Sequence, residues 1–181
     1  MKINISKKIL ILSILSLIAG AIIFIVCIYE KHTIPQYIFE YYEVDVEQFA
    51  EEAKEARLYE DKFEYVYVDK NGNLVFVTNA EQYEKLLDMY IADLEFYSYG
   101  YLKKGFYSEY NDSYDEIVMY CKKEEYGDDL TEDGLIHLMI EMSSCQALLV
   151  EDVDDIYVYG CIKDSETGEV LYEHTISAAS H

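Results

Sequence analysis

The chain has 181 residues, of which 51% are apolar and 15% aromatic, and its formal net charge is −22. This apolar content excludes an intrinsically disordered chain, because such chains combine high net charge with low hydrophobicity. The acidic excess excludes a nucleic-acid-binding protein, because the chain would repel phosphates. The length predicts one domain of ordinary size with a small appendage.

An uncharged run, residues 9–29, lies near the start of the chain and reads ILILSILSLIAGAIIFIVCIY. As a helix rising about 1.5 Å per residue, the run spans the roughly 30 Å hydrocarbon core of a bilayer, so it predicts a transmembrane helix. Lys2, Lys7 and Lys8 precede the run. The positive-inside rule therefore predicts a single-pass protein of the cell membrane, with residues 1–8 cytoplasmic and the C-terminal domain extracytoplasmic.

Two other interpretations of this N-terminal run remain open. A cleaved signal peptide would use the small residues Ala19, Gly20 and Ala21 as its cleavage site, although the apolar run continues beyond them. A lipoprotein would use Cys27, although the bulky Val26 precedes it where a small residue is usual. The transmembrane helix is the interpretation that the unbroken run favours.

The part of the chain after this run is more acidic than the whole. Residues 30–181 carry 11 basic and 36 acidic side chains, a net charge of −25. A field of this sign attracts cations and basic proteins and repels anionic lipid head groups. Any partner outside the membrane is therefore expected to be basic.

Three cysteines follow the run: Cys121, Cys145 and Cys161. Their number is odd, they form no CxxC motif, and their spacing is not typical of a zinc site. A disulfide between Cys145 and Cys161 is one alternative in an oxidising compartment. Buried free thiols are the alternative that we favour.

A short helix is predicted within residues 43–58. Asp45 is a candidate N-cap, and Gln48 stands three residues later, as in a capping box. Residues 30–60 are therefore interpreted as a juxtamembrane segment with a short helix. The extracytoplasmic domain proper is expected to comprise residues 61–177.

Residues 63–79 (FEYVYVDKNGNLVFVTN) predict a β-hairpin, with two alternating β-branched and aromatic runs joined around Asn71-Gly72. The DKNGNL stretch also has oxygen ligands at alternating positions, which suggests a calcium loop. However, the glycine stands fourth instead of sixth, and Ala80 occupies the place of the bidentate acid. The hairpin is the favoured interpretation.

A long amphipathic helix is predicted to begin after Asn79, a second capping-box residue with Gln82 three positions later. Its inward face is expected to carry Tyr83, Leu86, Leu87, Tyr90, Ile91, Leu94 and Tyr97. After Gly100, the segments YLKKGFY and YDEIVMYCK, separated by the polar SEYNDS, predict a second hairpin.

A second amphipathic helix is predicted from Thr131, followed by a third hairpin made of IYVYGCI and VLYEHTI around the polar KDSETGE turn. Three hairpins alternating with two helices predict an α+β domain. The simplest arrangement is one antiparallel sheet of about six strands with both helices on one face.

The succession of DKNGNLVFVT, an amphipathic helix, YDEIVMYCKK, a helix bearing SSCQALL, and IYVYGCIKDSETGEVLYE spans residues 60–176. It resembles a group of uncharacterised small exported or membrane-anchored proteins of Gram-positive gut bacteria. The resemblance implies the fold and the source, and it implies no activity or site residue.

No catalytic constellation or cofactor-binding motif is found in the sequence. His137 and Glu141 stand four residues apart on the second helix, and we interpret them as a solvent-face ion pair in preference to a metal site. His174 is expected to be a core or edge histidine. The acidic clusters at 126–130 and 151–155 suggest either weak calcium sites or solvated turns, and turns are favoured. We expect no catalytic residue, no metal site and no cofactor.

The function that these features favour is a membrane-anchored extracytoplasmic binding protein, with an acidic, tyrosine-rich surface for a basic protein or peptide. Immunity proteins and inhibitors have this general build. The candidate binding residues are Tyr99, Tyr101 and Tyr107, and whichever of the last two faces away from the helices is the better candidate. The alternatives are an accessory or structural subunit of a membrane complex, and an extracytoplasmic hydrolase.

Overall fold

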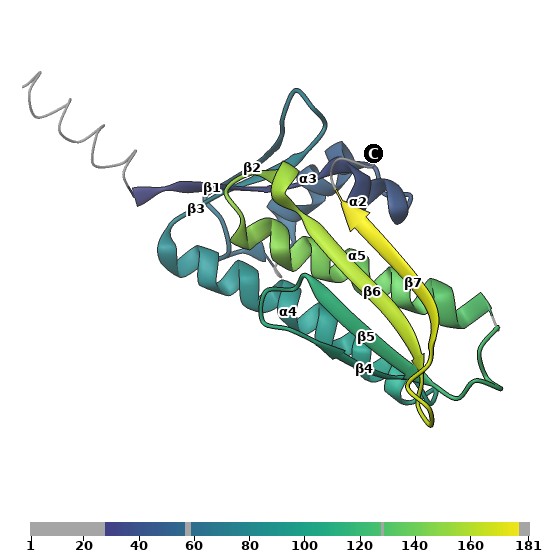
Figure 1. Cartoon of the computed structure of the whole chain (residues 1–181). Helices are drawn as coiled ribbons and strands as arrows, with labels where there is room; N and C mark the ends of the chain where they lie inside the picture. Colours follow the sequence, from purple (N-terminus) through teal and green to yellow (C-terminus); the bar gives the residue numbers. More distant parts are fainter. Residues whose placement is uncertain (1–27, 57–58, 128, 178–181) are drawn as a thin grey trace, which may run out of the picture.

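The computed structural model describes residues 28–56, 59–127 and 129–177, and it shows an α+β fold with two sheets (Figure 1). Among these residues no helix is long and apolar enough to cross a membrane. The predicted cytoplasmic N-terminus, and the predicted transmembrane helix up to residue 27, lie outside the described residues.

The described residues form eleven helices and strands, and a 3-10 turn, Val153–Asp155, precedes the last two strands. In chain order they are β1 (Glu30–Ile34), α2 (Gln36–Tyr41), α3 (Val46–Glu55), β2 (Tyr65–Val68), β3 (Leu74–Thr78), α4 (Ala80–Leu102), β4 (Tyr107–Tyr110), β5 (Glu116–Cys121), α5 (Asp129–Leu149), β6 (Tyr157–Asp164) and β7 (Val170–Ser177).

The first sheet has the strand order β1-β3-β2, and all of its pairs are antiparallel. Strands β2 and β3 form the predicted hairpin around Asn71-Gly72. Gly72 adopts a φ of +84°, which L residues rarely adopt, and the Asp69 carboxylate accepts hydrogen bonds from the backbone N–H groups of Asn71 and Asn73. Asp69 therefore stabilises the turn, as the hairpin interpretation requires.

Residues before the hairpin belong to the same fold. Strand β1 pairs with β3 along five residues, and Ile34, at its end, is fully buried. Helix α3 begins where the sequence predicted, because the Asp45 carboxylate accepts hydrogen bonds from the N–H groups of Glu47 and Gln48. The Gln48 side chain bonds to Glu52 instead of the N-cap backbone.

Helix α4 begins with the predicted capping box of Asn79 and Gln82, but it does not end at Gly100. It continues to Leu102 and ends in a tight turn at Gly105, where φ is +97° and the N–H of Phe106 bonds back to the carbonyl of Tyr101. The strand predicted for residues 101–107 is therefore wrong. Strand β4 instead starts at Tyr107 and uses part of the predicted turn.

The second sheet has the strand order β4-β5-β6-β7, and its central pair is parallel. This arrangement corrects the prediction of one antiparallel sheet. A parallel pair needs a long crossover, and helix α5 supplies it between β5 and β6. Of the outer pairs, β6 with β7 is the predicted third hairpin, whereas β4 pairs with β5 as a second hairpin whose first strand is Tyr107–Tyr110 instead of residues 101–107.

Helix α5 lies at the centre of the molecule. Every residue from Leu138 to Leu148 is buried, including the polar Glu141 and Ser143. The helix packs on β6 and β7, on α4, and on β1 and α2 of the N-terminal segment. Helices α4 and α5 thus lie on one side of the second sheet and leave its other side open (Figure 1).

Gly160 on β6 shows how closely α5 approaches the sheet. A Cβ at this position would lie 2.4 Å from Met139 Sδ and 3.2 Å from Leu135 Cδ1, both on α5. At Gly100, on the exposed side of α4, a Cβ would meet nothing within 4 Å. The two glycines therefore offer a matched pair of substitutions.

We expect Gly160→Ala to lower the free energy of unfolding by about 1–3 kcal/mol, because the methyl group overpacks the contact between α5 and β6. Gly100→Ala should raise it by up to about 1 kcal/mol, because alanine favours the helix. Chemical denaturation followed by circular dichroism measures both changes. Equal effects of the two substitutions would contradict the close contact.

Candidate functional site

The open side of the second sheet carries a row of tyrosines interleaved with acidic side chains. Residues directly opposite each other across a ladder share one side of a sheet, so the strand register assigns this face. We call it the open face, and it comprises Tyr107, Glu109, Glu116, Val118, Tyr120, Tyr157, Tyr159, Cys161, Lys163, Val170, Glu173, Thr175 and Ser177.

Tyr107 and Tyr120 lie opposite each other on β4 and β5, and both donate hydrogen bonds to Glu109. The distances are 3.1 Å from Tyr107 Oη to Glu109 Oε1 and 3.2 Å from Tyr120 Oη to Oε2. The two rings stack with their centroids 5.9 Å apart. The hydrogen bond to Glu109 raises the pKa of Tyr107, and desolvation followed by the Glu109 charge raises the pKa of Tyr120. Both phenols stay neutral at physiological pH and hold the carboxylate in place.

A second tyrosine–carboxylate pair lies across β6 and β7. Tyr159 Oη donates to Glu173 Oε2 over 3.0 Å, and this bond raises the pKa of Tyr159 to about 12. Tyr157, two residues earlier on the same side of β6, is 49% exposed. Aromatic surface therefore runs along both halves of the open face.

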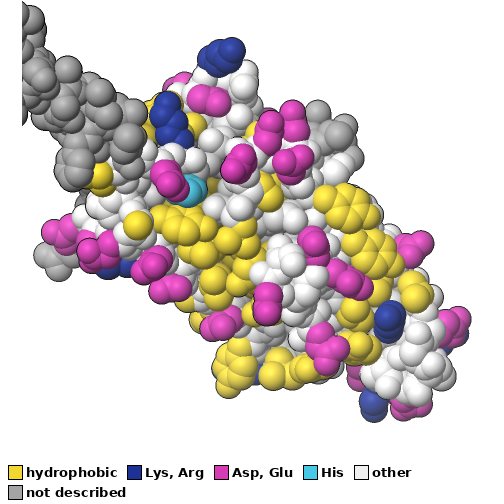
Figure 2. Space-filling view, turned by 60° about the vertical axis from the view of Figure 1, so that its left-hand side comes forward, with side chains coloured by type: hydrophobic (Ala, Val, Ile, Leu, Met, Phe, Trp, Pro, Cys, Tyr) yellow, Lys and Arg dark blue, Asp and Glu magenta, His cyan; other side chains and the backbone are white. Residues whose placement is uncertain are grey.

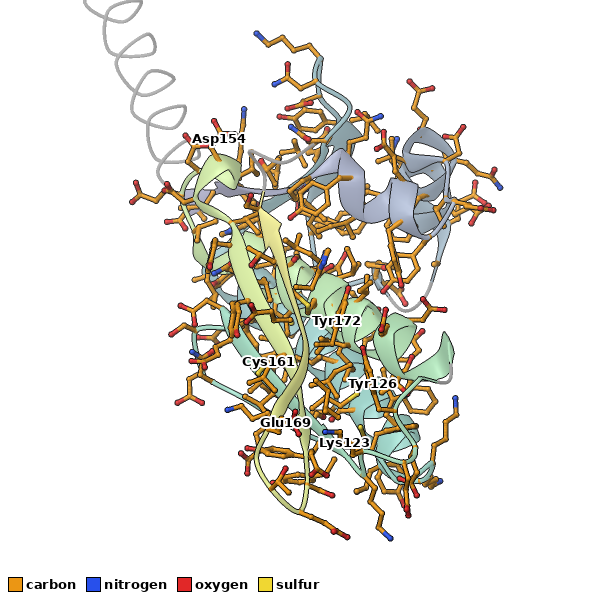
Figure 3. The ribbon with its side chains drawn as sticks, turned by 45° about the vertical axis from the view of Figure 1, so that its right-hand side comes forward. Lys123, Tyr126, Asp154, Cys161, Glu169 and Tyr172 are labelled. Atoms are coloured by element: carbon orange, nitrogen blue, oxygen red, sulfur yellow. The ribbon has the colours of Figure 1, made fainter. Side chains whose placement is uncertain are left out.

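A depression of 480 Å³ lies at the β4 end of the open face. Tyr107, Glu109 and Tyr120 line one part of it, and Lys122 and Glu125 line another. Nearby, Lys123 and Glu169 lie side by side (Figure 3), with 2.6 Å between Nζ and Oε2. This ion pair ties the loop after β5 to the turn between β6 and β7.

The charge of the open face is mixed, with an acidic excess. Glu109, Glu116 and Glu173 stand against one lysine of the face, Lys163. Acidic side chains also dominate the side of the molecule in Figure 2, where they surround a central group of hydrophobic side chains. The open face is therefore an aromatic surface in a negative field, which suits a partner with positive charge.

The structure places the three tyrosines predicted as binding residues in three different environments. Tyr99 is 56% exposed on α4, and Lys103 Nζ lies 4.4 Å from its ring centroid. Tyr101, also on α4, is half-buried, and its hydroxyl lies 3.1 Å from Nδ1 of His137. Tyr107 is 50% exposed and belongs to the open face. Of the three, Tyr107 is thus the one that faces away from the helices.

Sequence reasoning missed Tyr120, Tyr157 and Tyr159, although each lies in a segment predicted to be a strand. Alternation along each strand was visible, and it separates buried Ile117 and Val158 from their tyrosine neighbours. The pairing of β5 with β6 was not visible, and that pairing brings the tyrosines to one face.

His137 and Glu141 do not form a solvent-face ion pair, which corrects the prediction. Glu141 is 8% exposed, and one of its oxygens lies 3.5 Å from Nε2 of His137. The Tyr42 hydroxyl donates a short hydrogen bond to the same carboxylate. The ring of Tyr97 lies 4.3 Å from that of His137, centroid to centroid. Aromatic side chains from the C-cap of α2 and from α4 thus enclose this pair on α5.

The three cysteines after residue 28 are free and buried, as the favoured interpretation expected. Burial raises the pKa of all three thiols, and it raises that of Cys145 to about 12. A thiol with a raised pKa is a poor nucleophile, because the thiolate is the reactive form. Cys161 lies in the middle of β6 (Figure 3), on the open face but beneath its neighbours.

The acidic clusters have structural partners where the structure describes them. Asp152 caps the 3-10 turn, because its side chain accepts a hydrogen bond from the N–H of Asp154. Asp154 lies at one end of the second sheet, and Glu169 lies at the other end (Figure 3). Tyr126 donates to Glu132 over 2.6 Å. Within the described ranges, no group of three or more His, Cys, Asp or Glu side chains could hold a metal ion.

Comparison of the chain with protein-family models, with curated proteins and with solved structures found no match.

The tyrosine–carboxylate pairs of the open face can be tested by titration. Glu173→Gln keeps a hydrogen-bond acceptor but removes the negative charge beside Tyr159. We expect the pKa of Tyr159 to fall from about 12 towards the usual phenol value, because the phenolate is no longer repelled.

Carbon NMR of labelled tyrosine Cζ atoms, followed through an alkaline titration, measures this change. Glu169→Gln is the matched control, since it removes one charge outside the pair and should leave the Tyr159 titration in place. An unchanged Tyr159 titration in Glu173→Gln would show that the hydrogen bond does not form.

Proposed function

We propose that the chain is a membrane-anchored extracytoplasmic binding protein whose open face binds a basic protein or peptide. One observation carries the proposal: one side of a four-stranded sheet is not covered by any other described part of the chain, and it presents four tyrosines among three carboxylates. A sheet side without a covering helix normally carries alternating polar residues, whereas large aromatic side chains in that place are typical of contact surfaces.

Tyrosine suits such a surface because it offers a large, stiff contact area and a polar end. The hydrogen bonds to Glu109 and Glu173 hold the rings of Tyr107, Tyr120 and Tyr159 in fixed positions before a partner arrives. Less side-chain entropy is then lost on binding. The net charge of −25 beyond residue 29 would speed encounter with a cationic partner.

The membrane anchor in this proposal is the uncharged run at residues 9–29, with its lysines on the N-terminal side. Strand β1 starts at Glu30, so the folded part would begin directly at the membrane surface. A protein of this build could intercept basic proteins that approach the cell, as an immunity protein or an inhibitor does.

An accessory subunit of a membrane complex is the second candidate. Ala19, Gly20 and Ala21 give the predicted membrane helix a patch of small residues, where another helix could approach closely. Replacing residues 9–29 with an unrelated membrane helix separates the candidates, because the binding protein would keep its function and the subunit would lose it.

Substitution of the open face tests the proposal. Tyr107→Ser and Tyr157→Ser remove two aromatic rings that are half exposed, so the fold should tolerate both. The control is Tyr65→Ser on β2 of the first sheet, which removes a tyrosine that is 68% exposed away from the open face. The probes are peptides of matched length with positive, zero and negative net charge, added to the full-length protein in detergent.

We expect only the basic peptides to bind, with an association rate that falls at least roughly tenfold as salt is raised. The double variant Tyr107→Ser/Tyr157→Ser should weaken binding roughly tenfold or more, and Tyr65→Ser should not change it. Binding that ignores peptide charge, or that survives the double variant, would reject the open face as the binding surface.

A further inference from the structure

A cavity of 170 Å³ lies on the helix side of the molecule, between the N-terminal segment and helices α4 and α5. It is separate from the open face, which is on the other side of the second sheet. Phe39 and Phe49 form part of its apolar wall, and the hydroxyl-bearing rings of Tyr59 and Tyr90 also line it. Its acidic groups are Asp93 on α4 and Glu141 on α5.

Glu141 is the buried acid of the cavity, with 8% of its surface exposed. Its Oε1 accepts the hydrogen bond from Tyr42 and lies 3.5 Å from His137 Nε2. Its Oε2 has no hydrogen-bond partner among the residues that the structure describes. A buried carboxylate is costly unless its charge is paired and its oxygens are hydrogen-bonded, so a cationic group beside Glu141 would be stabilised.

Asp93 is the exposed acid of the cavity. Desolvation, followed by the charge of Glu141, raises its pKa, so the two carboxylates repel each other. No lysine or arginine of the described ranges lines the cavity. The pKa values of Tyr59 and Tyr90 are raised as well, chiefly by burial, so these rings stay neutral.

We propose that this cavity binds an alkylammonium group, with its charged end between Glu141 and Asp93 and its methylene groups against the aromatic wall. The volume equals that of about five or six water molecules, and so matches a group of about five non-hydrogen atoms, such as butylammonium. Aromatic rings attract ammonium groups, and the Glu141 carboxylate supplies a charged acceptor that is shielded from water.

Two sources present this chemistry: a free small amine, and the lysine side chain of a bound protein. Cadaverine and n-butylammonium stand for the first source, and a short peptide with one central lysine stands for the second. Butanol and butyrate serve as controls of similar size: butanol is uncharged, and butyrate carries the opposite charge. Calorimetric titration of the full-length protein in detergent with each probe measures the affinities.

We expect the amines to bind and butanol and butyrate to fail. Glu141→Gln and Asp93→Asn should each weaken amine binding roughly tenfold or more, because each removes one charged acceptor. Asp88→Asn is the matched control, since it removes an exposed carboxylate of α4 that does not line the cavity, and it should bind amines as the wild type does. Asp93 is exposed, so its variant should fold even where Glu141→Gln does not.

Several outcomes would overturn the proposal: no heat with either the free amines or the lysine peptide, equal affinity for butanol, or an equal loss of binding in Asp88→Asn. Arg57 lies outside the described residues, so Arg57→Gln is measured as well. Amine binding that is seen only in that variant would show that the guanidinium of the chain itself fills the cavity. Binding of the free amines but not of the lysine peptide assigns the cavity to small amines, and the reverse assigns it to a protein partner.

Discussion

The burial of helix α5 is the constraint on which the rest of the structure depends. The helix is the crossover that makes β5 and β6 parallel, and it packs on the second sheet, on α4 and on the N-terminal segment. From Leu138 to Leu148 the helix has no solvent face, so its polar residues there need partners within the fold. The hydroxyls of Ser143 and Ser144 donate hydrogen bonds to backbone carbonyls one turn earlier, and the Glu141 carboxylate accepts a hydrogen bond from the hydroxyl of Tyr42.

Local features of the fold could be predicted, because they depend on short stretches of sequence. The alternation of β2 and β3, the Asn79 capping box and the turn after β6 all act within a few residues. The prediction that the helix ends at Gly100 was wrong, because a single glycine is tolerated inside a helix. The helix instead ends in the turn at Gly105, about one helical turn later. The order of the strands depends on where α5 packs, which no local pattern records.

The same division holds for the candidate sites. Tyr107 could be selected from its segment, but its partners Glu109 and Tyr120 come together only through the β4–β5 register. His137 and Glu141 were correctly paired by their spacing of four residues and wrongly placed in solvent. The sequence of α5 predicts one apolar face, which packs on α4 and on the second sheet. In the structure, the N-terminal segment covers the remaining face of the helix as well.

Tyrosine–carboxylate pairs occur on both sides of the second sheet, and burial separates their roles. On the open face, Glu109 and Glu173 are exposed, so water solvates their charge and the hydrogen bonds mainly orient the rings. Glu141 lies in the interior, where the same kind of bond satisfies only part of a costly charge. An exposed carboxylate among fixed rings suits a broad protein partner, whereas a buried carboxylate in a small aromatic cavity suits a single cationic group. The two sites can therefore be separated by substitution, because no residue that lines the cavity belongs to the open face.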